Sequence, residues 1–236
     1  MAKLHHHLSE TVKINKISDD GKFGVFHIEG LYTGFGLTLG NALRRALFSS
    51  LSGAAVTQIK IKGVEHEFTT IPGIVEDVLK LALNFKNIRF KFFSDEPQIL
   101  TLKAKGEKEV KAGDVKPNAQ VEIINPELHL ATLTDKKAEL DIELTVEKGL
   151  GYFPAAERKL ERLAIGTIVL DAIFSPVTKV NTSVENMRIG ERTDYDRLKV
   201  EIETDGSISP SQALHKTANV LKDHFEKIFT ALAEEE

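Results

Sequence analysis

Apolar and polar residues alternate along several short stretches of the chain, with the two-residue period of half-buried strands. The clearest stretch carries Leu140, Ile142, Leu144 and Val146 at every second position, separated by acidic residues and a threonine. Shorter alternations of the same kind occur at residues 59–61, 100–102, 121–123 and 198–202. These stretches predict strands, and most of them lie in the middle of the chain.

Two segments in the first third of the chain have the period of amphipathic helices. After the glycine-rich run that begins at Gly34, one apolar face collects Leu39, Ala42, Leu43, Ala46 and Leu47. Further on, Pro72 suits a first helical turn. The apolar stripe that follows it consists of Val75, Val78, Leu79, Ala82 and Phe85. We therefore expect a helix on each segment, the second one beginning near Pro72.

The C-terminal segment has the strongest helical signal. Ser209, Pro210 and Gln212 supply an N-cap, a first-turn proline and the third-position partner of a capping box. The apolar positions that follow are spaced alternately by four and three residues: Leu214, Ala218, Leu221, Phe225, Ile228 and Leu232. A period of 3.5 keeps a narrow stripe facing one partner helix, which favours self-association. A helix packed wholly within its own subunit is the alternative.

The order of these elements predicts an α+β fold. Strands and turn signals fill roughly residues 53–179, the long helices lie towards the two ends, and strands and helices do not alternate regularly. We therefore expect a discontinuous domain, a sheet with two long helices, made of residues 1–52 and 180–236. A strand-rich domain of residues 53–179 is inserted into it.

The amino-acid composition limits the classes of function that the chain can have. A formal net charge of -4 argues against a protein that mainly binds phosphate backbones, and the absence of cysteine excludes disulfides, thiolate catalysis and cysteine zinc sites. No apolar run approaches the roughly 20 residues of a membrane span, and the N-terminus has no signal-type hydrophobic region. We expect a soluble, cytoplasmic protein. His5, His6 and His7 resemble a tag remnant or an unstructured end rather than a metal site.

The opposite face of the helix after Gly34 has an unusual composition. It gathers Asn41, Arg44, Arg45, Phe48 and Ser52. Arginine beside phenylalanine, with little lysine or glutamate, is typical of protein interfaces. We infer a protein contact here, with burial on both sides within one subunit as an equally weighted alternative.

Signals of catalysis are weak. Gly34, Gly36 and Gly40 precede a helix but lack the lysine and the spacing of a phosphate-binding loop, so tight packing explains them better. His66 and Glu67 form an acid–base pair without a third member. Asp194 and Asp196 resemble half of a divalent-metal site, and a solvated turn is the favoured interpretation. We expect neither a cofactor nor a metal.

The segment of residues 85–93 interleaves basic and aromatic residues, as a single-strand nucleic-acid platform does. Acidic residues follow at once, and Ile88, Phe90 and Phe92 alternate. A strand with these three residues facing the core is therefore preferred.

Ordered matches over nearly the whole chain resemble one family, the bacterial RNA polymerase alpha subunit in its N-terminal region. The matching runs are Glu29-Gly30, residues 34–45, Ser49-Ser50, residues 53–55, 64–68, 71–73, 76–78, 83–86, 121–123, 125–126, 148–152, 171–177, 193–196 and 204–208.

This resemblance implies a non-catalytic module of the DNA-directed RNA polymerase. It dimerises and nucleates assembly of the beta and beta-prime subunits, with omega and sigma joining in the holoenzyme. The implied dimer residues are Leu39, Leu43, Leu47, Leu214, Ala218, Leu221, Phe225, Ile228 and Leu232. The implied beta contacts are Arg44, Arg45, Phe48, His66, Glu67 and Phe68, and the implied beta-prime contacts are Lys86 and Val177. Nucleotidyl transfer would belong to the assembled complex only.

Two departures from the family pattern matter. Phe48 stands where smaller aliphatic residues are common, so the partner's pocket would differ in size. Full-length members continue to a DNA-binding domain, whereas this sequence ends at Glu236, so we expect no direct sequence-specific DNA binding. The alternatives to a scaffold are a free-standing dimeric module and a hydrolase or metalloenzyme using His66, Glu67 and Asp194.

Overall fold

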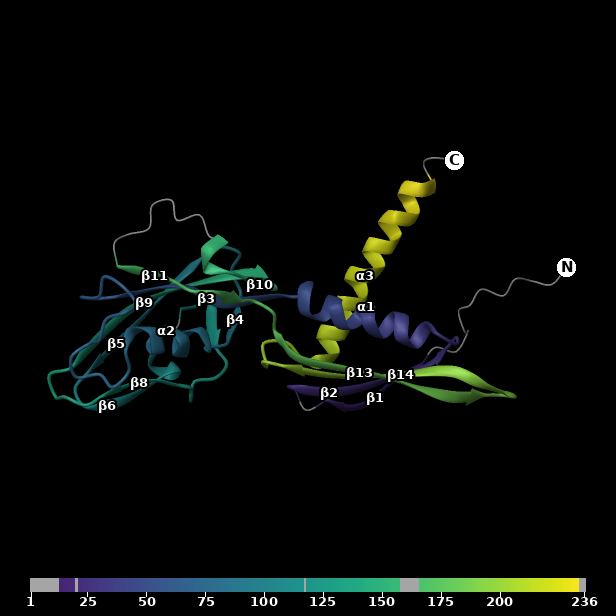
Figure 1. Cartoon of the computed structure of the whole chain (residues 1–236), viewed down its shortest axis with the longest axis horizontal. Coiled ribbons are helices and arrows are strands. Elements are labelled where there is room, and N and C mark those ends of the chain that lie inside the picture. The colour runs from purple at the N-terminus through teal and green to yellow at the C-terminus, as the bar shows by residue number, and fades with distance from the viewer. Residues whose placement is uncertain (1–12, 20, 117, 158–165, 234–236) are drawn as a thin grey trace. The chain divides into compact units, whose positions relative to one another are not determined.

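Both ends of the chain contribute to one unit and the middle forms another. In this computed structural model, residues 1–51 and 176–236 make the first unit and residues 52–175 make the second unit (Figure 1). The structure describes residues 13–19, 21–116, 118–157 and 166–233, so the three histidines at positions 5–7 lie outside the described residues. The unit boundaries fall at 51/52 and 175/176, against 52/53 and 179/180 expected from the sequence.

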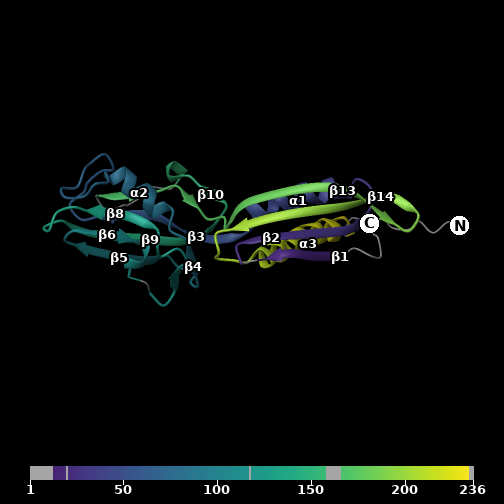
Figure 2. The same ribbon diagram turned by 90° about the horizontal axis from the view of Figure 1, so that it is seen from below.

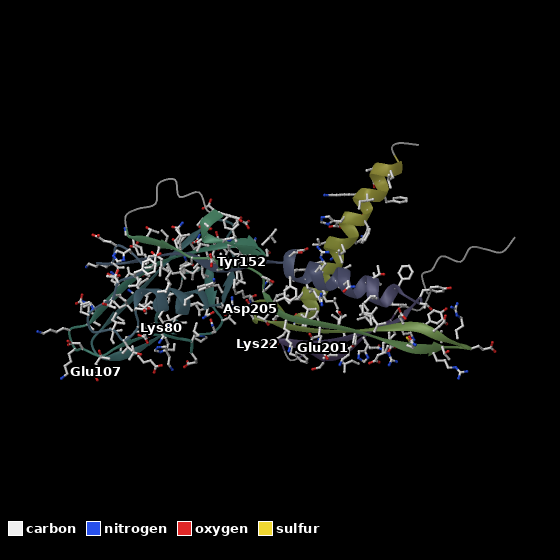
Figure 3. All side chains as sticks on the ribbon, viewed as in Figure 1. Lys22, Lys80, Glu107, Tyr152, Glu201 and Asp205 are labelled. Carbon is white, nitrogen blue, oxygen red and sulfur yellow. The ribbon has the colours of Figure 1, made fainter. Side chains whose placement is uncertain are left out.

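The first unit contains one antiparallel four-stranded sheet in the order β1-β2-β14-β13. The strands are β1 (Lys13–Asp19), β2 (Phe23–Leu31), β13 (Val177–Ile189) and β14 (Arg192–Thr204). Leu198, Val200 and Ile202 on β14 are fully buried and alternate with charged residues, as the sequence predicted. Glu201 lies on the other face, where its side chain pairs with Lys199 (Figure 3).

Helix α1 (Phe35–Ser49) lies on the apolar face of this sheet, and the N-terminal part of helix α3 (Pro210–Ala233) packs beside it (Figures 1 and 2). Their core residues include Leu43, Leu47 and Leu214. The predicted capping box of α3 is present, because the Gln212 amide donates to Ser209 Oγ at 3.3 Å and the Ser209 amide donates to Gln212 Oε1 at 3.5 Å. Among the described residues, no helix is both long enough and apolar enough to cross a membrane.

The second unit is rich in strands. Its main sheet has the order β11-β3-β9-β5, and the two-stranded pairs are β4-β7, β6-β8 and β10-β12. The strands are β3 (Ser52–Ile61), β4 (Phe90–Phe92), β5 (Gln98–Lys105), β6 (Lys108–Lys111), β7 (Val121–Ile123), β8 (His129–Leu133), β9 (Glu139–Leu150), β10 (Tyr152–Phe153), β11 (Thr167–Val169) and β12 (Ala172–Ile173). The helical segments are α2 (Val78–Lys86), η1 (Ala112–Asp114) and η2 (Ala155–Glu157). The α+β class is confirmed.

Helix α2 begins later than the sequence predicted. Asp77 caps it by accepting a 2.7 Å hydrogen bond from the Lys80 amide, so Pro72 lies in the preceding turns and not in the helix. As a result Val75 lies outside the helix and is exposed, whereas Val78 and Phe85 are fully buried.

Only the middle of the basic and aromatic segment forms a strand, β4, because Phe85 and Lys86 end helix α2 and Ile88 lies in the connection before the strand. Ile88 and Phe90 are buried, and Phe92 is partly buried against the same core. Phe93, which follows the strand, is exposed, and Lys91 Nζ lies 5.6 Å from the centre of its ring.

Candidate protein-contact site

The turn that opens helix α1 is held by a buried carboxylate. Gly34 adopts φ +86°, and the amides of Gly34 and Gly36 donate to Asp196 Oδ2 at 2.9 and 3.0 Å. The Asp196 carboxylate comes from β14, and the residue is only 5% exposed. Amides at a helix N-terminus attract anions, and here the protein's own aspartate fills that position. The expectation that Asp196 lies in a solvated turn is therefore wrong.

The glycines bring the helix against the sheet. A Cβ at Gly36 would lie 2.8 Å from Val184 Cγ1 and 2.9 Å from Asp196 Oδ2. A Cβ at Gly40 would lie 3.0 Å from Leu198 Cδ1. Close approach of the helix backbone to the sheet therefore explains these glycines. This is the interpretation that the sequence favoured over a phosphate-binding loop.

Asp194 also has a structural partner. Arg192 donates from Nε and Nη2 to its two carboxylate oxygens at 3.0 and 2.7 Å. These bonds lower the pKa of Asp194 to about 2. The Arg192 guanidinium lies 5.1 Å from the ring centre of Tyr32 and 5.2 Å from that of Tyr195. Both aspartates lie on strand β14, and Asp194 is held in an ion pair rather than open to a metal.

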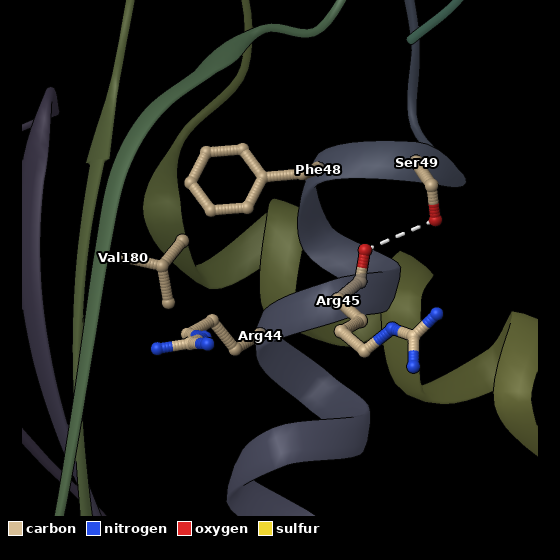
Figure 4. Close-up of a pocket in the computed structure, with 5 residues that line it drawn as sticks. All are labelled: Arg44, Arg45, Phe48, Ser49 and Val180. Atoms are coloured by element: carbon tan, nitrogen blue, oxygen red, sulfur yellow. Dashed lines mark hydrogen bonds between the residues drawn. The ribbon is translucent and has the colours of Figure 1, made fainter.

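The outer side of α1 forms an open pocket of about 430 Å³. Its lining consists of Arg44, Arg45, Phe48, Ser49 and Val180. Arg44 and Phe48 lie on the side of the helix that faces Val180, and Arg45 extends on the other side (Figure 4). Ser49 Oγ donates to the Arg45 carbonyl at 3.0 Å.

Within its unit, helix α1 is not buried on both sides, which was the alternative interpretation of its sequence. Arg44, Arg45 and Phe48 are exposed in their unit, with Phe48 at 39%. A guanidinium group near an aromatic ring, as in Arg44 and Phe48, can bind a carboxylate or a backbone carbonyl and an apolar side chain together. The outward arrangement predicted from the sequence is present, and contact with a partner stays a prediction.

The predicted dimer residues divide into two groups. Leu43, Leu47 and Leu214 are buried in the core of their own unit, and Leu39 and Leu221 pack against it partly buried. The first three expose little surface in their own unit, and the role of the whole set in a dimer stays a prediction. Ala218 is exposed, as are Phe225, Ile228 and Leu232 at 65%, 57% and 62%.

The remaining predicted contacts lie on both units. Phe68 in the second unit is 79% exposed, His66 is exposed, and Glu67 is partly exposed. The Lys86 ammonium lies 3.4 Å from Asp171 Oδ2. Val177 is 4% exposed in the first unit, so this side chain offers little contact surface as it stands. Among the described residues, no group of three or more histidine or acidic side chains could hold a metal ion.

A buried polar network was missed by the sequence analysis. Glu76 is 5% exposed and its carboxylate contacts His129 and Thr132 from strand β8. Nothing in the local pattern around Glu76 or His129 signals this pairing, because the two residues are 53 positions apart in sequence.

Comparison with known proteins gives a consistent result. Residues 59–175 match the family model of the RNA polymerase Rpb3/RpoA insert domain. The chain is 50% identical over 219 residues to the DNA-directed RNA polymerase subunit alpha of Symbiobacterium thermophilum, covering 93% of this chain and 69% of that protein. It is 50% identical over 215 residues to that of Moorella thermoacetica (91% and 68%) and 46% identical over 219 residues to that of Alkaliphilus oremlandii (93% and 69%). The chain therefore belongs to the family of DNA-directed RNA polymerase alpha subunits.

Proposed function

We propose that two copies of this chain pair and form a non-catalytic scaffold on which the beta and beta-prime subunits of RNA polymerase assemble. In this proposal, nucleotidyl transfer is performed only by the assembled complex, which acts in the cytoplasm.

The exposed end of helix α3 carries this proposal. The N-terminal half of the helix packs in the core of its unit through residues such as Ala213, Leu214 and Leu221, and the rest of the helix extends away from the sheet of its unit (Figure 1). That outer part exposes Phe225, Ile228, Phe229 and Leu232, each by more than half. Four large apolar side chains on one helix form a patch of a few hundred Å², which a second copy could cover.

The regular spacing of this patch supports pairing with a second helix. Phe225, Ile228 and Leu232 continue the 3.5-residue repeat that starts at Leu214. A straight stripe of this kind fits one partner helix, and a twofold axis would place the same stripe of the second copy against it.

The pocket on α1 supports capture of a large subunit. Its walls are the exposed Arg44, Arg45 and Phe48 of α1 and the edge of the core at Val180, so it can stay open to other proteins. A central arginine beside an aromatic ring is a typical energetic centre of a protein interface. We assign this pocket to the beta subunit and the region around Lys86 to beta-prime.

Co-expression with the two large subunits tests the proposal. We expect a tagged chain to co-purify with beta and beta-prime in an assembly that contains two alpha copies, and RNA synthesis only by that assembly. In the same co-purification, Arg45→Ala should capture less beta than the wild type, and Arg188→Ala, at an exposed arginine on the β13–β14 hairpin, is its matched control. A chain that forms dimers but captures neither subunit would overturn the scaffold and favour a free-standing dimeric module.

A further inference from the structure

A carboxylate–histidine bridge fixes an exposed segment of the second unit. Glu76 Oε1 lies 3.0 Å from His129 Nε2, and Glu109 Oε1 lies 3.0 Å from His129 Nδ1. The other Glu76 oxygen accepts the Thr132 amide at 2.7 Å, and Thr132 Oγ1 lies 3.2 Å from Oε1. One nearly buried carboxylate thus connects the entry of α2 to strand β8.

The segment held by this bridge, residues 66–77, presents apolar side chains to the outside. Phe68 is 79% exposed and Val75 is 63% exposed. Backbone bonds tie the segment down: the Val75 amide donates to the Thr132 carbonyl at 3.1 Å, and the Val78 amide donates to the Thr69 carbonyl at 3.1 Å. The Glu76 carboxylate accepts the Thr132 amide next to the first of these bonds, so its position determines how this part of the segment lies on β8.

We propose that Glu76 is a positioning residue for the contact surface of segment 66–77, and that protonation of His129 strengthens this positioning. The inference rests on the proposed function and on the beta contact that the family resemblance implies for His66, Glu67 and Phe68 in this segment. It adds a dependence on pH that the proposed function does not contain.

The geometry gives the reason for the pH dependence. Both ring nitrogens of His129 face a carboxylate oxygen. Only the imidazolium can donate from both nitrogens, because each neutral tautomer has one donor and turns a lone pair towards the other carboxylate. Loss of the proton therefore weakens the contact to Glu76 or the contact to Glu109.

The charges around the ring favour the imidazolium. Glu76 faces it from the α2 entry and Glu109 from β6. On the paired strand, Lys111 is the register partner of His129, but its ammonium pairs with Glu127 at 2.7 Å. Lys80 on α2 is exposed, and its amide belongs to the cap at Asp77 (Figure 3).

The direction of both pKa changes agrees with this balance. The hydrogen bond to Glu76 raises the pKa of His129 above its ordinary 6.5, and Glu109 adds to the effect. Burial raises the pKa of Glu76, but the bonds from His129 and Thr132 outweigh it and the net pKa is below the ordinary 4.5. The bridge is therefore complete between these two ordinary values and weakens as pH rises through the raised pKa of His129.

The decisive experiment measures binding of the purified 236-residue chain to the beta subunit at about pH 6 and about pH 8.5, values that bracket histidine titration. We expect wild-type affinity to fall by roughly threefold or more between them, a change in the usual range for residues that act through others. His129→Gln should bind at both pH values as the wild type does at the higher one. Glu76→Gln should bind more weakly at both.

Controls separate this effect from other titrating groups. His215→Gln, at an exposed histidine on α3, should keep the wild-type pH profile, and Glu107→Gln should keep wild-type affinity (Figure 3). Hydrogen exchange of the amides of Val75 and Thr132 gives a second measurement. In His129→Gln these amides should exchange faster than in the wild type at about pH 6, after correction for intrinsic rates, with the fold intact by circular dichroism.

The outcomes distinguish the two proposals. If the wild type does not bind beta at either pH, the proposed function fails. If the wild type binds but His129→Gln retains the same pH profile and the same amide exchange, the proposed function stands and this inference is overturned.

Discussion

Truncating Phe225 tests the proposed dimer most directly. The residue is 65% exposed on α3. A phenylalanine buries about 150–250 Å², so its exposed part is roughly 130 Å², and covering that area contributes about 3 kcal/mol at 25 cal/mol per Å². Because alanine keeps part of this area, Phe225→Ala costs about 2 kcal/mol per protomer. A twofold interface loses this twice, which corresponds to about a thousandfold weaker dimer.

Sedimentation equilibrium of the wild type and the variant measures this change. Phe93→Ala is the matched control, since Phe93 is a similarly exposed phenylalanine at 59% but lies in the second unit. We expect the control to dimerise as the wild type does, and the thermal unfolding of both variants to show that each is folded.

Two results would refute the reasoning. One is a wild-type chain that stays monomeric at concentrations well above micromolar. The other is a Phe225→Ala dimer as tight as the wild-type dimer, because the apolar end of α3 would then not lie in the interface.

Three further predictions concern other parts of the molecule. Asp196→Ala leaves the amides at the start of α1 without their acceptor, so we expect a loss of about 1–2 kcal/mol in the free energy of unfolding, measured with urea; an unchanged midpoint would contradict the capping role. Arg45→Ala should keep the dimer but weaken beta capture by a few kcal/mol, measured in pulldowns against Arg188→Ala, and equal capture by both would count against the pocket. Because the pKa of His129 is raised, the bridge contributes its full stability below pH 6.5 and loses it as pH rises through the raised pKa. Above this range the melting temperature of the wild type should therefore fall more than that of His129→Gln. Melting temperatures that change in parallel with pH would exclude the bridge as a source of stability.

Periodic patterns were sufficient for the main elements. The alternation around Leu140 predicted β9, the capping residues at Ser209 and Gln212 predicted the start of α3, and the arginines and phenylalanine after Gly40 predicted an outward face on α1. These features are local, because side-chain period and cap chemistry depend on residues a few positions apart.

The heptad stripe of α3 shows the limit of such patterns. Its spacing is continuous from Leu214 to Leu232, yet Leu214 packs in its own unit and Phe225 is exposed. The pattern gives the direction of an apolar face, but only the position of the sheet decides where along the helix that face meets its own core.

Long-range pairs decided the rest of the site. Asp196 accepts the amide of Gly36, which is 160 positions earlier in the sequence, and Glu76 contacts His129 across 53 positions. The sequence by itself determined the main strands, the cap of α3 and the outward arginine face, since short-range periodicity and hydrogen bonding produce them. The tertiary structure alone decided which carboxylates are buried and which leucines are covered, because burial depends on elements that are distant in the chain and become neighbours only after folding.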